Sequence, residues 1–240
     1  MINEGFYIMD KKMSYRHELK FLVPEQELCL LENKISQICK IDSHAGEKGV
    51  YNIRSIYFDT FDDQYLEENI AGVDNRRKFR IRIYDLNENI IKLECKSTKY
   101  GLKKKEICNI TKQQCEQLMA GNIMIPVMEN QEVLRKLQYE YMTKLLQPKV
   151  IVEYIRTPFV YEVGNVRITF DRKICSSHCV GGFWDRKLVK REILPEGINI
   201  LEVKYDEVLP STIKEMLNEG VCLNRTSFSK YAMCRVNSLR

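Results

Sequence analysis

Two consecutive segments decide the fold of this 240-residue chain, Arg76-Arg77-Lys78-Phe79-Arg80-Ile81-Arg82-Ile83-Tyr84 and, after a short turn, Ile90-Ile91-Lys92-Leu93-Glu94-Cys95-Lys96. Successive side chains of a β-strand point to opposite faces, so each segment predicts a strand with one apolar and one charged face. The charged faces carry Lys78, Arg80, Arg82, Lys92, Glu94 and Lys96. Because half-buried strands usually pair an apolar face with a mixed polar one, faces this rich in cations indicate contact with an anion.

Composition sets the outer limits of the function. The chain has 38 Lys and Arg against 33 Asp and Glu, a net charge of +5 that is too small for a general nucleic-acid binder. No run of about 18 apolar residues could span a bilayer, and residues 1–12 lack the apolar core of a signal peptide. We therefore expect a cytoplasmic protein with no nucleic-acid partner. No linker divides the chain, which predicts an N-terminal extension over residues 1–14 and one domain over residues 15–240.

The nine cysteines indicate small buried side chains in a reducing compartment. One cluster, Cys175-Ser176-Ser177-His178-Cys179, could supply two thiolates and an imidazole to zinc. It lacks a second pair at suitable spacing, so packing is the favoured interpretation, although the sequence leaves a metal role open.

Alternating patterns predict about eight strands, from 15–23 to 199–205, with amphipathic helices over 25–38, 111–120 and 130–146 between them. This order is typical of an α+β protein built on an antiparallel sheet. On an open sheet the cationic faces would repel one another across neighbouring strands, whereas a closed barrel could point them at one enclosed polyanion. We therefore predict a closed eight-stranded antiparallel β-barrel, or tunnel, with helices packed outside.

Strand parity extends the charged face to the later strands. The candidate inward cations are Arg16, Lys20, Arg80, Arg82, Lys92, Lys96, Arg156, Arg167, Lys204 and Lys230, and the candidate inward acids are Glu18, Glu94, Asp171 and Glu202. Alternation does not determine which of Lys103, Lys104 and Lys105 point inward. Such an excess of buried positive charge is unfavourable unless anions fill the site, which indicates a phosphate-rich guest. Arginine forks match phosphate oxygens, and a few carboxylates suit a divalent metal that bridges phosphates.

Seven short motifs recur in a recognisable order. They are Tyr15-Arg16-His17-Glu18-Leu19-Lys20-Phe21, Ser55-Ile56-Tyr57-Phe58-Asp59-Thr60, Arg77-Lys78-Phe79-Arg80-Ile81-Arg82-Ile83-Tyr84, Lys92-Leu93-Glu94-Cys95-Lys96, Arg167-Ile168-Thr169-Phe170-Asp171, Leu201-Glu202-Val203-Lys204-Tyr205 and Ser229-Lys230-Tyr231. Together they resemble the VTC polyphosphate polymerase domain of the triphosphate tunnel metalloenzyme superfamily. The resemblance runs from about residue 15 to residue 231, nearly the whole chain.

The resemblance implies a tunnel enzyme that transfers the γ-phosphate of ATP to a growing polyphosphate chain and releases ADP, with Mn²⁺ or Mg²⁺ as cofactor. It implies that the catalytic, phosphate-binding cations are Lys20, Arg80, Arg82, Arg156, Arg167 and Lys230, and that Glu202 holds the metal. Further substrate-binding candidates are Arg16, Lys92, Lys96 and Lys204. Glu18 and Glu94 are further metal candidates, although each could equally pair with neighbouring lysines.

Two other functions remain open at this point. The same tunnel could hydrolyse triphosphates with water as the acceptor, or a non-catalytic domain could bind polyphosphate or inositol phosphates with the cations alone, without Glu202. Superfamily hydrolases typically open with Glu-x-Glu-x-Lys, whereas this chain has Arg16-x-Glu18-x-Lys20, which favours chain binding over hydrolysis. Eukaryotic relatives couple synthesis to a membrane channel, so the resemblance also allows a separate membrane-protein partner.

Overall fold

The computed structural model describes residues 16–100 and 102–237; the N-terminal extension expected over residues 1–14 lies outside them. The strands are β1 (His17–Pro24), β2 (Lys40–Ile41), β3 (Tyr51–Asp59), β4 (Arg76–Tyr84), β5 (Lys92–Lys99), β6 (Leu102–Asn109), β7 (Gln147–Tyr161), β8 (Val166–Ser177), β9 (Arg191–Glu192), β10 (Ile198–Tyr205) and β11 (Asn224–Arg225). The helices are α1 (Glu25–Ser36), α2 (Gln64–Ile70), α3 (Lys112–Met119), α4 (Glu132–Lys144), α5 (Ser211–Asn218) and α6 (Lys230–Val236).

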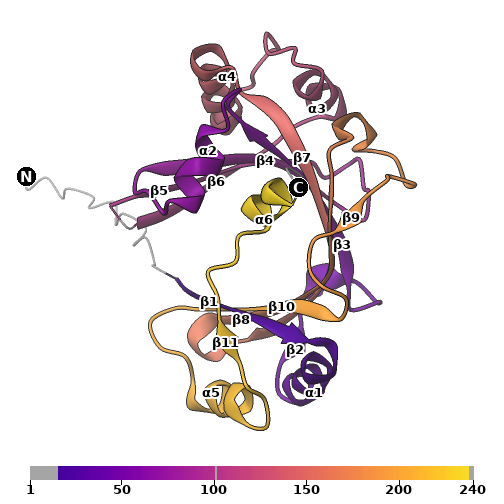
Figure 1. Cartoon of the computed structure of the whole chain (residues 1–240), viewed down its shortest axis with the longest axis vertical. Coiled ribbons are helices and arrows are strands. Elements are labelled where there is room, and N and C mark those ends of the chain that lie inside the picture. The colour runs from indigo at the N-terminus through magenta and orange to yellow at the C-terminus, as the bar shows by residue number, and fades with distance from the viewer. Residues whose placement is uncertain (1–15, 101, 238–240) are drawn as a thin grey trace, which may run out of the picture.

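All of these strands belong to one antiparallel sheet. Its main order is β11-β1-β10-β8-β7-β3-β4-β5-β6, with β2 paired to β7 and β9 paired to β8. Figure 1 shows the sheet bent around α6, with β4 to β6 on one side and β1, β10 and β11 on the other. Within the described residues β6 forms no ladder with β1 or β11, so the sheet is open and the prediction of a closed eight-stranded barrel is wrong.

Charge explains why the sheet stays open. The free edge strand β6 carries Lys103, Lys104 and Lys105, all exposed, and lysines on an edge strand oppose pairing with another strand. The two ends of the sheet meet through side chains instead, since Lys103 Nζ lies 3.6 Å from Glu18 Oε2. The prediction assumed that only closure could relieve repulsion between cationic faces. A bent sheet with interspersed carboxylates aims the cations inward without closing.

Helices cover the outer, convex face of the sheet and bury apolar stripes there. In α1, Leu28, Leu31 and Ile35 recur at helical spacing and are fully buried in a cluster with residues of β1, β8 and β10. The helices α3 and α4 cover β4 and β5 in the same way, with Leu118 and Leu137 in a second cluster. No helix in the described parts of the chain is long and apolar enough to cross a bilayer.

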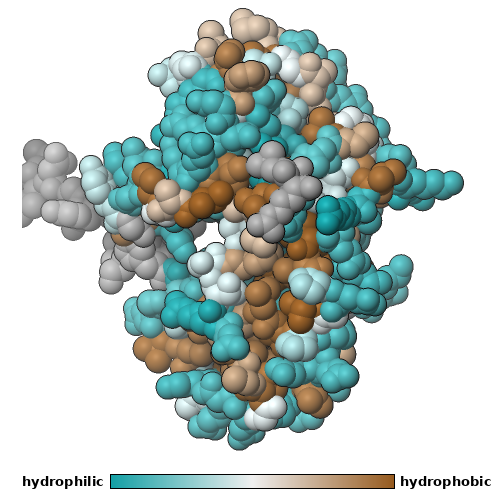
Figure 2. All heavy atoms as spheres, viewed as in Figure 1, coloured by the Kyte–Doolittle hydropathy of each residue, from teal (hydrophilic) through white to brown (hydrophobic). Residues whose placement is uncertain are grey.

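The short helix α6 lies on the inner, concave face. Its residues Tyr231 and Cys234 are buried in a third apolar cluster with Tyr57 and other side chains of β3 and β7. Tyr231 OH donates a hydrogen bond to Asp59 Oδ2, and Asp59 also accepts from the backbone N–H groups at the start of α2. Figure 2 shows apolar residues in a band down the middle of this view, between hydrophilic regions. Apolar packing therefore holds α6 against the sheet, and the charged residues surround it.

Candidate functional site

The inner face carries a buried ion cluster where β7, β8 and α6 meet. Arg156 lies directly opposite Asp171 in the ladder, and its Nε and Nη2 each donate to one oxygen of that carboxylate at 2.7 Å. Lys230, the first residue of α6, places its Nζ 2.7 Å from Asp171 Oδ2. Burial raises the pKa of Asp171, but the charges of Arg156 and Lys230 lower it below its usual value. This carboxylate is therefore ionised and shared by two cations.

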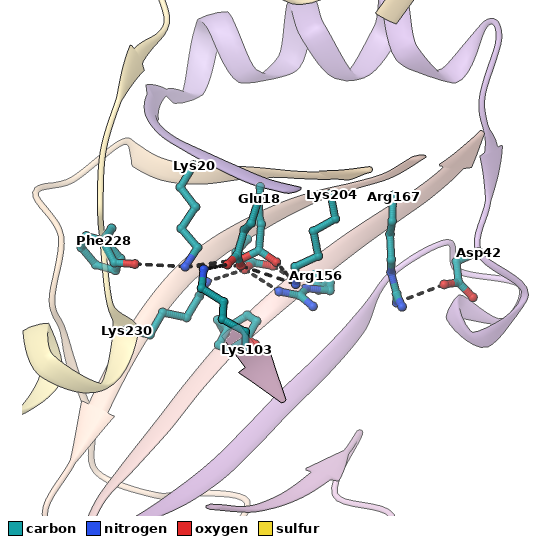
Figure 3. A network of polar contacts seen from close by, with 12 residues as sticks. Glu18, Lys20, Asp42, Lys103, Arg156, Arg167, Lys204, Phe228 and Lys230 are labelled. Atoms are coloured by element: carbon teal, nitrogen blue, oxygen red, sulfur yellow. Dashed lines mark hydrogen bonds and ion pairs between the residues drawn. The ribbon is translucent and has the colours of Figure 1, made fainter. Parts of the chain in front are cut away.

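A second cluster joins β1 and β10, two strands that are hydrogen-bonded neighbours (Figure 3). Lys20 Nζ lies 3.4 Å from Glu18 Oε1 and 3.9 Å from Glu202 Oε2, and Lys204 pairs with the same two carboxylates. Burial raises the pKa of Glu202, but the charges of Lys204 and Lys230 hold it well below its usual value. The two carboxylates thus share one small region with the lysines between them.

On the other side of the inner face, Arg80 and Glu94 lie opposite each other on β4 and β5. Arg80 Nε and Nη2 both donate to Glu94 Oε2, at 2.8 and 2.5 Å, and Lys105 Nζ lies 3.1 Å from Glu94 Oε1. Burial raises the pKa of Glu94, but the charges of Arg80 and Arg82 hold it well below its usual value. Glu94 therefore follows the ion-pair interpretation that the sequence left open, with both oxygens facing cations.

The cations next to this pair have few negative partners. Arg82 is buried, donates only to hydroxyl oxygens and forms no ion pair in the described part of the chain. Lys78, Lys96 and Lys105 stand directly opposite one another on β4, β5 and β6, and we call these three residues the lysine row. Like charges directly opposite on neighbouring strands are destabilising. The lysine row is therefore a place where an anion would relieve repulsion.

The pKa values in the lysine row follow from this crowding. Burial and the charge of Lys20 lower the pKa of Lys78 to about 7. Burial lowers the pKa of Lys105 to about 8, although Glu94 acts against the shift. Lys96 is accessible to solvent, and the largest cause of its strongly lowered pKa is the charge of Arg80, followed by burial.

Three residues expected at the site lie apart from these clusters. Arg16 precedes β1 and bonds to Asp206 and to the carbonyl of Asn165 rather than joining Glu18. Arg167 Nη2 lies 3.0 Å from Asp42 Oδ2, and Figure 3 shows this pair set to one side of the Glu18 cluster. Lys92 lies over the ring of Tyr84, with its Nζ 5.3 Å from the ring centroid.

Sequence reasoning missed several residues that the structure adds to the site. Lys103 and Lys105 point inward to Glu18 and Glu94, which fixes the direction that parity left open. Lys78 was placed on the charged face with Arg80 by simple alternation, but it was left out of the expected site residues. Tyr57 and Tyr154 carry the hydroxyl oxygens that contact Arg80 and Arg82. A lone tyrosine in an apolar strand gives no sequence signal for such a role.

The carboxylates can be tested against a divalent metal. Within residues 16–100 and 102–237, no three carboxylate, imidazole or thiol side chains converge to hold a metal, Cys175, His178 and Cys179 included. Mg²⁺ in phosphate sites is usually held by one or two carboxylates, with waters and substrate phosphates completing the shell. Glu18 and Glu202 form such a pair, so this donor set fits a cation that arrives with phosphate. Glu94 lies apart from them on β5, where the guanidinium of Arg80 donates two hydrogen bonds to one of its oxygens and Lys105 lies against the other.

Comparison with solved structures shows where this fold recurs. HpAC1 from Hippeastrum, described as a candidate adenylyl cyclase with a dominant triphosphatase activity, matches with a TM-score of 0.58 and 16% identity over 94% of this chain and 96% of that chain. A candidate adenylate cyclase (bh2851) from Bacillus halodurans matches with a TM-score of 0.49 and 19% identity, over 86% and 87% of the two chains. At such identity the likeness to HpAC1 concerns the fold alone.

Comparison at the level of sequence gives the family. No protein of curated function matches the chain. The model of the VTC domain family matches residues 15–238, which is nearly the whole chain and includes every cluster described above. The resemblance seen in the seven motifs is therefore confirmed, and the chain belongs to the VTC domain family.

Proposed function

We propose that this VTC domain is a metal-dependent polyphosphate polymerase, which transfers the γ-phosphate of ATP to a growing polyphosphate chain and releases ADP. One observation carries the proposal. Cations from β1, β4, β5, β6, β7, β10 and α6 line the same concave face, next to a pair of carboxylates that fits a phosphate-bound metal. A linear chain of phosphates has the charge and the extended shape that such a lining requires.

The residues suit phosphoryl transfer because that chemistry depends on positioning and on stabilising charge. Arg80, Arg82 and Arg156 are buried, so their charges act at low effective dielectric on the oxygens of a transferring phosphate. Lys20, Lys204 and Lys230 supply further positive charge from β1, β10 and α6. The attacking oxygen of a polyphosphate end is already anionic, so the transfer needs no strong general base.

Glu18 and Glu202 would hold the divalent cation, Mn²⁺ or Mg²⁺, which when bound neutralises charge on the phosphate oxygens. Lys20 and Lys204, which lie against these two carboxylates, would then be available to the phosphates. Replacement of one set of partners by another would keep both carboxylates, buried Glu202 and partly buried Glu18, paired throughout.

A second candidate is a triphosphatase that uses the same face with water as the acceptor. The specific observation in its favour is the fold shared with HpAC1, which is described as having a dominant triphosphatase activity. The two functions differ only in the acceptor, so binding of nucleotide and metal does not separate them. The products do.

The deciding experiment incubates purified protein with ATP and Mn²⁺ and measures long polyphosphate, ADP and free phosphate. A polymerase produces ADP and polyphosphate in step, whereas a triphosphatase produces ADP and free phosphate in step and no polyphosphate. Free phosphate without polyphosphate would reject the polymerase. Binding of tripolyphosphate without any turnover would indicate a binding domain instead.

Glu202→Gln tests the metal role. The change should lower turnover at least about a hundredfold, because metal-ion catalysis contributes several kcal/mol to such reactions. Tripolyphosphate binding in the absence of metal should persist or tighten, since the variant removes one negative charge from the cationic lining. Glu207→Gln, an exposed carboxylate just after β10, is the matched control and should behave as the wild type. Unchanged turnover of Glu202→Gln would exclude this residue as a metal ligand.

A further inference from the structure

We infer that Ser55 and Tyr154 are positioning residues, which hold the Arg82 guanidinium through neutral oxygens and so leave its positive charge for a phosphate group. The inference rests on the proposed function and deepens it, because it identifies Arg82 as the buried arginine whose charge is most available to the phosphate chain. It also gives a role to the Ser55–Thr60 motif, which the family resemblance quotes but the proposed chemistry does not use.

The contacts of Arg82 are well defined. Ser55 lies directly opposite Arg82 on the neighbouring strand β3, and Arg82 Nε donates to Ser55 Oγ at 3.1 Å. Arg82 Nη2 donates to Tyr154 OH on β7 at 3.2 Å. Ser55 is fully buried and Tyr154 nearly so, which fixes both oxygens. Two oxygens on two strands thus determine the plane of the guanidinium, and its other N–H groups bond to no further group in the part of the chain that the structure describes.

A neutral acceptor and a carboxylate differ in their electrostatic effect on a buried arginine. Both satisfy N–H donors and fix the orientation, but a carboxylate also cancels most of the charge. Arg156 is held by both oxygens of Asp171, and Arg80 by Glu94. Arg82 is held by hydroxyls and forms no ion pair within the described residues. Its charge still acts on Glu94, but no carboxylate of the described chain accepts a hydrogen bond from it, so it stays more available to a ligand than the charges of Arg80 and Arg156.

The same arrangement recurs along β3, where alternate side chains point to the inner face. Tyr57 OH accepts from Arg80 Nη1 at 2.9 Å, and Tyr51 OH accepts from Arg167 Nη2 at 3.3 Å. With Ser55, β3 supplies hydroxyl oxygens to three arginines, of which Arg80 and Arg167 also have a carboxylate partner and Arg82 has none within the described residues. Burial raises the pKa of Tyr154, but the charges of Arg156 and Arg82 lower it overall, as expected for a phenol oxygen that faces cations.

The test compares Ser55→Ala with Ser55→Asp and measures tripolyphosphate affinity by calorimetry in metal-free buffer. Ser55→Ala should bind about tenfold more weakly, since a hydrogen bond to a charged group is lost. Ser55→Asp returns a partner to Arg82 but neutralises it, so it should bind more weakly than Ser55→Ala. If Ser55 only satisfied a buried donor, Ser55→Ala would lose stability but bind tripolyphosphate as tightly as the wild type, and that result would overturn the inference.

A double-mutant cycle gives an independent reading that does not depend on the folding of Ser55→Asp. Tyr154→Phe should weaken tripolyphosphate binding about tenfold in the wild-type background and have no further effect in the Arg82→Ala background. Additive effects of the two changes would reject the positioning role. Ser36→Ala and Tyr141→Phe remove comparable hydroxyl contacts on the outer helices and serve as controls that should bind normally.

The same titration separates this inference from the proposed function. If the wild-type protein binds tripolyphosphate and Ser55→Ala equals it, only the positioning role fails. If the wild-type protein binds no tripolyphosphate, the proposed function fails and the inference fails with it.

Discussion

The two halves of the inner face differ in how far their positive charges are paired with carboxylates. In the half formed by β1, β7, β8, β10 and α6, which we call the matched half, buried carboxylates lie among the cations, and Asp171 and Glu202 each pair with two of them. In the half formed by β4, β5 and β6, which we call the cationic half, Glu94 is the one fully buried acid within the described residues. Arg82 and the lysine row surround it.

Because of this difference, the two halves affect the stability of the ligand-free protein in opposite ways. Buried charges are tolerated when partners remain within the protein, so the matched half can form without a ligand. The cationic half holds like charges in register, and this arrangement weakens the folded state until an anion arrives. We therefore expect removal of a charge to destabilise the matched half and to stabilise the cationic half, with binding affected in both.

The largest effect is expected for Asp171→Asn in the matched half. The change leaves Arg156 and Lys230 buried without a negative partner, and breaking a buried pair in this way costs about 3–5 kcal/mol of unfolding free energy. Chemical denaturation measures this loss of unfolding free energy. Asp206→Asn is the matched control, because it breaks the more exposed pair with Arg16 and should cost less than about 1 kcal/mol. Similar losses in the two variants would contradict the comparison.

Which features of the fold and the site could be predicted from the sequence depends on how far apart in the chain the interacting residues lie. Alternation along one strand is local, and it placed Arg80, Arg82 and Glu94 on one face correctly. It failed for Arg16 because that residue precedes β1, where no strand fixes its direction. Whether the ends of the sheet join is decided between segments far apart in the chain, at the free edge of β6, and repulsion alone did not reveal it.

The pairing of charges was also beyond the sequence. Alternation along the strands predicts which acids and cations point inward, but it does not predict that Asp171 pairs with both Arg156 and Lys230. That choice depends on the position of α6, which Tyr231 and Asp59 fix from opposite parts of the chain. The hydroxyl contacts of Arg82 depend on the order of three strands, β4, β3 and β7, for the same reason.

A smaller effect of opposite sign is expected for Lys96→Met in the cationic half. The variant removes the middle charge of the lysine row and should raise the unfolding free energy by about 0.5 kcal/mol, a modest gain because solvent reaches the ammonium group. Tripolyphosphate affinity should fall at the same time. Lys99→Met, on the exposed end of β5, is the control and should change neither quantity. A loss of stability on removing Lys96 would place this lysine among the matched charges.

A further effect, and the most specific to the cationic half, is its dependence on pH. Lys78 has a pKa of about 7 in the folded chain and 10.5 as its ordinary value, so between these limits the unfolded chain binds more protons. The unfolding free energy of the ligand-free protein should therefore rise from pH 7 to pH 9. Glu94 and Glu202 have pKa values well below this range and stay charged throughout it.

Binding should follow the opposite trend, because a polyanion favours the charged form of each lysine. Tripolyphosphate affinity should fall from pH 7 to pH 9, and binding at pH 8 should take up roughly one proton per titrating lysine. Calorimetry in two buffers of different ionisation enthalpy measures this uptake, and Lys78→Met subtracts the contribution of the ligand itself. Because charge repulsion that weakens the free protein is the same repulsion that the ligand relieves, the variant should flatten both pH profiles together. A variant that flattened only one of them would show that Lys78 acts on folding or on binding, but not on both through the same charge.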